Sequence, residues 1–143
     1  QSTYGVLKLG TIAEEAADLM QTFDVRAVDA DVTVGTLSGG NAQKIVIARE
    51  LAGSPRVLIA AQPTRGLDIG AAHFVHEQLL RLRGQGIGIL LISTDLDELM
   101  ALCDRFVVLF EGRIIGAVDA GEVSREGLGL LMAGHALSEE ARA

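Results

Sequence analysis

The sequence predicts an α/β fold in which a mostly parallel sheet is flanked by helices. Three short aliphatic runs have the continuous apolar character of strands covered on both faces: RVLIAA (56–61), GIGILLIS (86–93) and RFVVLFEGRII (105–115). Apolar residues at helical spacing separate these runs twice, in 69–85 and 95–103. This alternation predicts right-handed crossovers between parallel strands, with a tight hairpin turn at the EGRII step.

A helical region precedes the strands. Residues 11–23 place their apolar side chains on one helical face, and residues 37–53 form a second helix that Gly53 and Pro55 stop. A polar connection joins the two. We therefore expect a helical subdomain over 1–54, a core region over 55–134 that ends in a helix at 122–133, and a disordered tail over 135–143.

Composition restricts the possible classes of function. The 143 residues carry 19 acids against 12 bases, and the resulting charge of −7 weighs against nucleic-acid partners and anionic lipid. The single Cys103 permits no intramolecular disulfide, and no apolar run approaches the roughly 20 residues of a membrane span. The start at Gln1, without an initiator Met, leads us to expect a segment of a longer protein.

The stretch LSGGN (37–41) has the chemistry of an anion site. Ser38 is a suitable helix N-cap, and Gly39 and Gly40 have no side chains to obstruct an anion approaching the amides of Gly39, Gly40 and Asn41. These amides lie at the positive end of the helix that follows. An ordinary loop and cap would explain an isolated SGG equally well, so the motif needs its context.

That context resembles the second half of an ATP-binding-cassette (ABC) ATPase domain. LSGGN, a helix, an aliphatic strand, PTRGLD, a helix, a strand and STDLDE follow in the family's order. No GxxxxGK[ST] loop occurs in the 143 residues, so the resemblance implies a partial P-loop core that lacks its Walker A half. SGGN, PTRGLD and EGRI are similar to the second cassette of fused two-cassette importers of monosaccharides and nucleosides. AAQPTRGLD is most similar to the nucleoside importers.

The resemblance also assigns residues to roles. It implies that the signature loop closes on ATP held by a partner cassette and that the D-loop lies at the interface between the cassettes. The signature loop comprises Ser38, Gly39, Gly40 and Asn41, and the D-loop comprises Gly66, Leu67 and Asp68. Asp68 can in addition cap the helix that begins at Ile69.

Three family groups are replaced together. Ala61 and Gln62 stand at the Walker B acids, and Thr94 stands at the switch histidine. The Ala61 methyl group cannot ligate magnesium, and Gln62 can hydrogen-bond a water molecule but cannot take its proton. We expect no competent catalytic residue here, and no ATP or Mg²⁺ bound by the isolated segment. The alternative is that these three residues merely pack a strand end in a fold that is not an ATPase.

The resemblance implies an energising subunit at the cytoplasmic face of the membrane, peripheral to it, which binds ATP and Mg²⁺ mainly through the partner cassette. Its partners would be that cassette and permease subunits. Two alternatives remain, a soluble ABC ATPase of translation or DNA repair and a structural association domain. We also expect the isolated segment to self-associate through uncovered apolar sheet surface.

Other charged groups have simpler explanations. His73, His76 and Glu77 fit a solvated helix face better than a metal site. Asp95 with Glu98 three residues later predicts a helix cap. Lys44 and Arg49 are expected to be ordinary exposed charges, the alternatives being an approach to phosphates or a place in the cassette interface.

Overall fold

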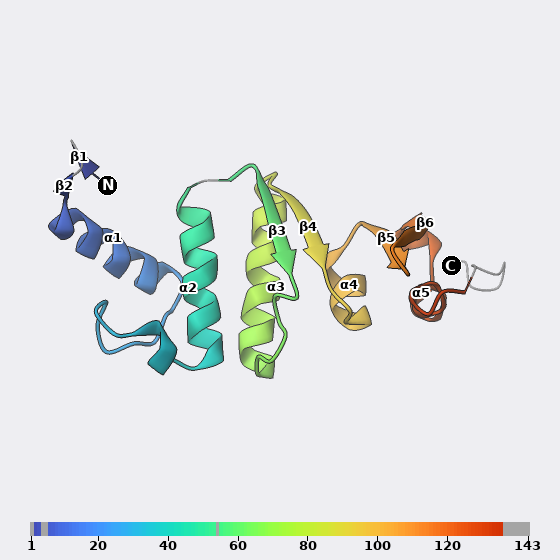
Figure 1. Cartoon of the computed structure of the whole chain (residues 1–143), viewed down its shortest axis with the longest axis horizontal. Helices are drawn as coiled ribbons and strands as arrows, with labels where there is room; N and C mark the ends of the chain where they lie inside the picture. Colours follow the sequence, from blue (N-terminus) through green and yellow to red (C-terminus); the bar gives the residue numbers. More distant parts are fainter. Residues whose placement is uncertain (1, 4–5, 54, 136–143) are drawn as a thin grey trace. The chain divides into compact units, whose positions relative to one another are not determined.

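The computed structural model describes residues 2–3, 6–53 and 55–135 (Figure 1). Positions 136–143 of the predicted tail lie outside the described residues. The described elements, in chain order, are β1 (Ser2–Thr3), β2 (Val6–Leu7), α1 (Leu9–Thr22), η1 (Val34–Thr36), α2 (Gly39–Ala52), β3 (Val57–Ala61), α3 (Ile69–Gly84), β4 (Gly88–Ile92), α4 (Leu96–Leu102), β5 (Arg105–Phe110), β6 (Arg113–Asp119), η2 (Ala120–Glu122) and α5 (Arg125–Met132). The predicted α/β fold class is confirmed.

Two compact units divide the chain. The first comprises Gln1–Leu58 and Pro63–Gln78, and the second comprises Ile59–Gln62 and Leu79–Ala143. The division passes through α3, whose first part belongs to the first unit and whose last part belongs to the second.

The core of the first unit forms where α1 ends and α2 packs beside it. Phe23, Val25 and Ala48 are buried there, with Phe74 of α3 packed against them. At the end of α1 the chain reverses through Asp24, whose φ of 48° lies in the left-handed region. Because the Val25 N–H donates to Met20 O (2.8 Å), the last carbonyls of the helix are satisfied in a Schellman-type turn.

The strands β3 and β4 pair with each other and run in the same direction (Figure 1), as the crossover pattern predicts. The strand pattern predicts cover on both faces, and this is wrong for the described residues, whereas the uncovered apolar sheet surface that we also expect is present. Ile59, Leu90 and Ile92 are 66%, 54% and 49% exposed, and the residues that alternate with them are half-buried. One apolar face of this ladder therefore remains open.

The strands β5 and β6 form an antiparallel hairpin in which Phe110 pairs with Arg113. The turn residues Glu111 and Gly112 have φ values of 46° and 75°, as a two-residue type I′ turn requires. The predicted hairpin turn is thus confirmed. The expectation that β5 extends the parallel sheet is wrong, because β5 pairs with β6 alone in the described part of the chain.

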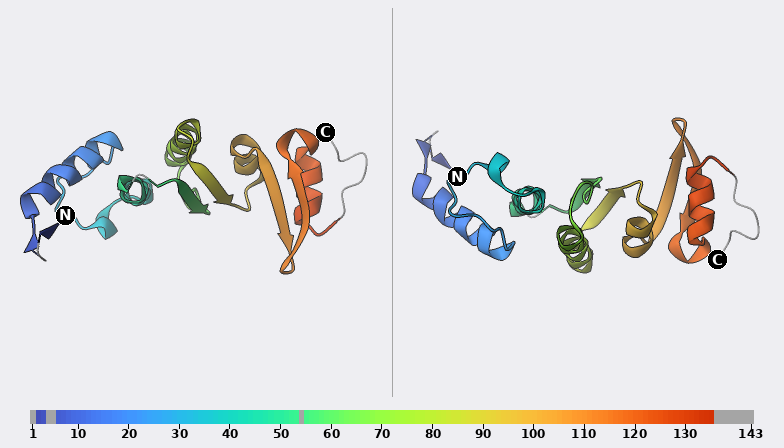
Figure 2. Two further views of the ribbon diagram at one scale, coloured as in Figure 1. Left: turned by 90° about the horizontal axis from the view of Figure 1, so that it is seen from above. Right: turned by 90° about the horizontal axis from the view of Figure 1, so that it is seen from below.

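Helices α4 and α5 complete the second unit, and α5 lies along the hairpin (Figure 2). The core beneath α5 comprises Phe106, Val108, Val123, Leu128 and Leu131. The predicted cap at Asp95 is confirmed, since its Oδ1 accepts from the N–H groups of Asp97 (2.9 Å) and Glu98 (3.1 Å). The Asp95 N–H itself donates to Ser93 Oγ (3.0 Å).

The end of α5 provides a test of this packing. Gly134 has a φ of 86°, and a Cβ added there would lie 2.6 Å from Cε1 of the Phe110 ring. We expect Gly134→Ala to lower the free energy of unfolding by about 1–3 kcal/mol, because it adds backbone strain to a steric clash. Urea denaturation of the purified chain measures this. Gly121→Ala is the matched control, since a Cβ at Gly121 meets nothing within 4 Å. If both variants lowered the free energy of unfolding equally, the packing of Gly134 against Phe110 would be contradicted.

Candidate functional site

The signature loop begins α2 with a side-chain cap. Ser38 is extended (φ −61°, ψ 153°) and its Oγ accepts from the Asn41 N–H at a long 3.4 Å. Gly39 and Gly40 are the first two helical residues, so no carbonyl one turn earlier in α2 can accept from their amides. Ser38 and Gly39 are exposed. Two amides and a hydroxyl group are thus available to an anion at the positive end of α2.

The two glycines serve different purposes. A Cβ on Gly40 would lie 2.8 Å from Ala71 Cβ, so this glycine is required for the close approach of α2 to the start of α3. A Cβ on Gly39 would meet only Leu67 Cδ2, at 3.8 Å. The sequence suggested that both positions are glycine to give an anion access. This explanation remains for Gly39, whereas at Gly40 the packing against Ala71 already requires glycine.

The Asn41 side chain is held on both sides. Its Oδ1 accepts from the Arg26 backbone N–H (2.9 Å), and its Nδ2 donates to Ser38 Oγ (3.1 Å). The carboxamide therefore faces the protein, and this contact across 15 residues has no signal in the sequence.

Lys44 is not the ordinary exposed charge that the sequence suggested. Its Nζ donates to the backbone O of Asp24 (2.7 Å) and to Asp24 Oδ2 (2.9 Å), and it lies 4.7 Å from the centre of the Phe74 ring. Only 13% of the Lys44 side chain is exposed. The hydrogen bond from Lys44, together with its charge, lowers the pKa of the Asp24 carboxyl group below its usual 3.8.

The D-loop lies beside the signature loop in the first unit. Asp68 Oδ1 accepts from the Ala71 N–H (2.8 Å), so Asp68 caps the first turn of α3 as expected. Gly66 has a φ of 76°, a left-handed conformation that glycine adopts without strain, and Leu67 N–H donates to Thr64 O (3.1 Å). The close approach of Gly40 to Ala71 keeps the two loops together.

The three replaced positions gather at one edge of the second unit. Ala61 ends β3, and Thr94 lies two residues beyond the end of β4, its partner strand. The Gln62 N–H donates to Ile92 O (2.7 Å), and Gln62 has a φ of 49°. This edge does not fit a magnesium ion, because a methyl group, an amide and a hydroxyl group provide no carboxylate ligand.

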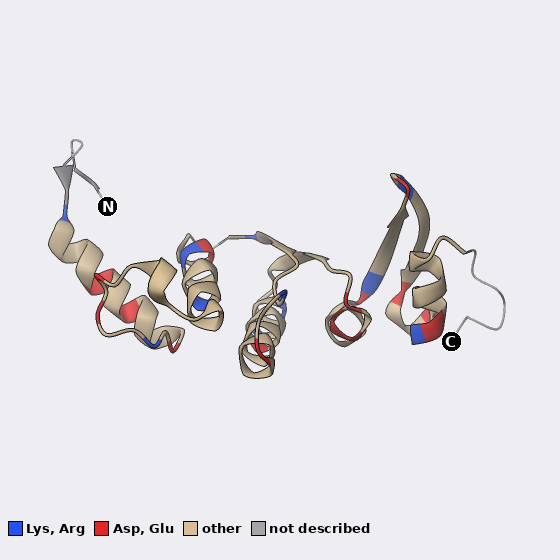
Figure 3. Ribbon diagram, turned by 60° about the horizontal axis from the view of Figure 1, so that its bottom comes forward, with Lys and Arg blue, Asp and Glu red and all other residues tan. Residues whose placement is uncertain are grey.

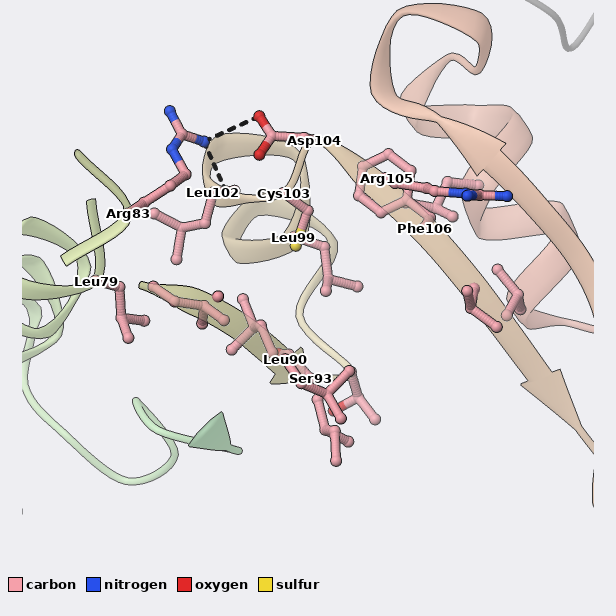
Figure 4. A pocket seen from close by; sticks show the side chains of 18 of the residues that line it. Leu79, Arg83, Leu90, Ser93, Leu99, Leu102, Cys103, Asp104, Arg105 and Phe106 are labelled. Carbon is pink, nitrogen blue, oxygen red and sulfur yellow. Dashed lines mark hydrogen bonds and ion pairs between the residues drawn. The ribbon is translucent and has the colours of Figure 1, made fainter. Parts of the chain in front are cut away.

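A hollow of about 880 Å³ separates β4 from β5 (Figure 4). Aliphatic side chains line most of it, and at its rim Arg83 donates to Leu102 O (3.1 Å) and Asp104 Oδ1 (3.2 Å). Burial raises the pKa of the Cys103 thiol in the wall. Thr94 contributes to the lining, whereas Ala61 and Gln62 do not. The hollow is thus an apolar gap between two strands that do not pair with each other.

Charge offers no further site in the described chain. Lys and Arg occur on several of the described elements rather than on one alone (Figure 3). His73 Nδ1 lies 3.5 Å from Glu77 Oε1, and no three potential metal ligands gather within the described ranges. No described helix has both the length and the apolar character needed to span a membrane.

The chain is similar over most of its length to import ATP-binding proteins. It is 48% identical to the guanosine import ATP-binding protein NupO of Bacillus subtilis over 142 residues. This match covers 99% of the chain and 28% of that relative. It is 43% identical to the nucleoside import ATP-binding protein NupA of Lactococcus lactis, over 96% of the chain and 27% of the relative. A ribose import ATP-binding protein of Rhizobium meliloti, RbsA 2, is 48% identical over 78% of the chain and 22% of its own length. No protein-family model matches the chain.

Solved structures agree on the fold. A nucleotide-free ATP-binding cassette of an ABC transporter matches 82% of the chain with a TM-score of 0.68 and 28% identity. A bacterial ABC transporter cassette solved as a dimer matches the same share, with the same TM-score and 23% identity. The chain spans 46% and 51% of these two cassettes. The chain belongs to the ABC ATPase family.

The backbone at Gln62 can be tested directly. We expect Gln62→Val to lower the free energy of unfolding by about 1–3 kcal/mol, because a β-branched residue is strained at a positive φ. Gln62→Gly should change it by less than about 1 kcal/mol, since the relief of strain offsets the entropy lost by glycine. Urea denaturation measures both, with Gln85→Val as a control at an exposed residue whose φ is not positive. Equal effects of the three variants would contradict the geometry.

Proposed function

We propose that this chain is part of the ATP-hydrolysing subunit of an importer for nucleosides or monosaccharides. In this proposal the signature loop contacts ATP bound on a second cassette, which supplies the lysine, the magnesium ligands and the general base. The observation that carries the proposal is the capped start of α2, where Ser38 and the amides of Gly39 and Gly40 are available to an anion. The D-loop beside it would form the rest of the contact with the second cassette.

The three replaced positions support unequal roles for two composite sites, each formed by the nucleotide-binding residues of one cassette and the signature loop of the other. A site completed by Ala61, Gln62 and Thr94 would lack a magnesium ligand and a general base. Loss of a general base costs about two to four orders of magnitude in rate. Turnover would then occur at the site that this chain completes with its signature loop, while the opposite site would stay inert.

The proposed solute, partners and location rest on the names of the relatives rather than on the site. The relatives are named as guanosine, nucleoside and ribose import ATP-binding proteins, which favours a permease as the membrane partner and a peripheral position at the cytoplasmic face. The solved dimeric cassette supports a second cassette as the other partner. A fused two-cassette chain remains part of the proposal, as does the self-association of the isolated segment through the exposed face at Ile59, Leu90 and Ile92.

The signature loop is tested by Ser38→Arg in the full-length protein. The long side chain would cover the amides of Gly39 and Gly40, so we expect ATP turnover and solute uptake to fall by about 10²–10³. Thr33→Arg is the control, since Thr33 is exposed, precedes the same loop and makes no side-chain cap. Unchanged turnover in Ser38→Arg would instead favour a purely structural role for the chain.

The inert site is tested by restoring its chemistry. The triple variant Ala61→Asp, Gln62→Glu and Thr94→His in the full-length protein should leave the total rate of ATP hydrolysis little changed, because turnover occurs at the other composite site. Steady-state ATPase assays at saturating Mg-ATP measure this. A large gain in rate would mean that the edge lacked only these three groups, and the proposal of unequal roles would be wrong.

A further inference from the structure

The Asn41 carboxamide can have only one orientation. The group that it meets on one side is the Arg26 backbone N–H, which can donate but cannot accept. The atom facing Arg26 must therefore be Oδ1, so Nδ2 must face Ser38 Oγ, 3.1 Å away. The backbone at Arg26 thus determines which end of the amide meets the signature serine.

This orientation determines where the serine hydroxyl hydrogen can point. Ser38 Oγ accepts from Asn41 Nδ2 and, at 3.4 Å, from the Asn41 backbone N–H. A hydroxyl oxygen has two lone pairs, and both are directed at these donors. Its hydrogen must then point away from Asn41, and Ser38 is exposed. The hydroxyl group is held as a donor toward the side where an anion would bind.

The turn that carries Arg26 is itself held in place. Asp24 has a strained φ of 48°, and Lys44 from α2 donates to both its backbone O and its carboxylate. Lys44 also lies over the ring of Phe74 in α3. The segment Asp24–Arg26 is therefore fastened to α2 at Lys44 and again, one turn earlier in the helix, at Asn41.

We propose that Asn41 is a positioning residue that fixes the Ser38 hydroxyl group as a hydrogen-bond donor to the bound nucleotide, with Lys44 and Asp24 holding the backbone against which Asn41 is oriented. The inference rests on the proposed function, because it concerns the same signature loop. It removes the Asn41 side chain from the set of nucleotide contacts and gives it a role that acts through Ser38.

A double-mutant cycle in the full-length ATPase tests this inference. We expect Asn41→Ala and Ser38→Ala each to lower kcat by roughly ten- to a hundredfold. This factor corresponds to the loss of one hydrogen bond to a charged group. Asn41→Ala should have almost no further effect in the Ser38→Ala background, because the group that it positions is then absent. Gln43→Ala is the control, an amide removed from the same helix. If the fold-decreases in kcat of Asn41→Ala and Ser38→Ala multiply in the double variant, the inference is overturned.

A second variant keeps the test decisive if Asn41→Ala is poorly folded. Asn41→Asp has nearly the same shape and can still accept from the Arg26 N–H, but its other oxygen would draw the Ser38 hydrogen inward. Its loss of kcat should disappear in the Ser38→Ala background, whereas a loss caused by charge repulsion would persist there and overturn the inference. Unchanged kcat in Ser38→Ala alone would refute the proposed function. A normal Ser38→Ala defect with full activity in both Asn41 variants would refute only the inference.

Discussion

The first turn of α2 has two backbone amides that no carbonyl of the helix can satisfy, and the surrounding structure holds this turn in place. Ser38 caps it, the missing side chain of Gly40 lets it approach α3, and Asn41 ties it to the backbone at Arg26. A helix start with this geometry attracts anions through its amides and its dipole. The function that we propose uses this feature, and the contacts of Ser38, Gly40 and Asn41 maintain it.

The function that we propose assigns no ATP hydrolysis to the site that Ala61, Gln62 and Thr94 would complete. In this proposal a competent site would need two carboxylates at the end of β3 and a histidine after β4, and Ala61, Gln62 and Thr94 stand at these positions. Gln62 nevertheless keeps a left-handed backbone and a 2.7 Å hydrogen bond to the neighbouring strand. The backbone of this edge is therefore well defined, whatever chemistry its side chains provide.

Local signals predicted much of the fold because each depends on a few neighbouring residues. Helix periodicity placed α1 and α2, capping chemistry placed Asp68 and Asp95, and the Glu111–Gly112 turn identified the hairpin. Long-range pairing was less predictable: aliphatic runs do not specify which strands pair, so the separation of β5 from β4 was missed. Uncovered apolar sheet surface was expected, but the sequence did not show that it would lie at Ile59, Leu90 and Ile92. The contacts of Asn41 and Lys44 were missed for the same reason, since their partners lie 15 and 20 residues away.

The most direct test of the central claim is the structure of the full-length ATPase trapped with a non-hydrolysable ATP analogue. The account predicts a terminal phosphate within hydrogen-bonding distance of Ser38 Oγ and the amides of Gly39 and Gly40, with the rest of the nucleotide held by a different cassette. A signature loop that faces solvent in this state, or that is covered by its own cassette, would contradict it.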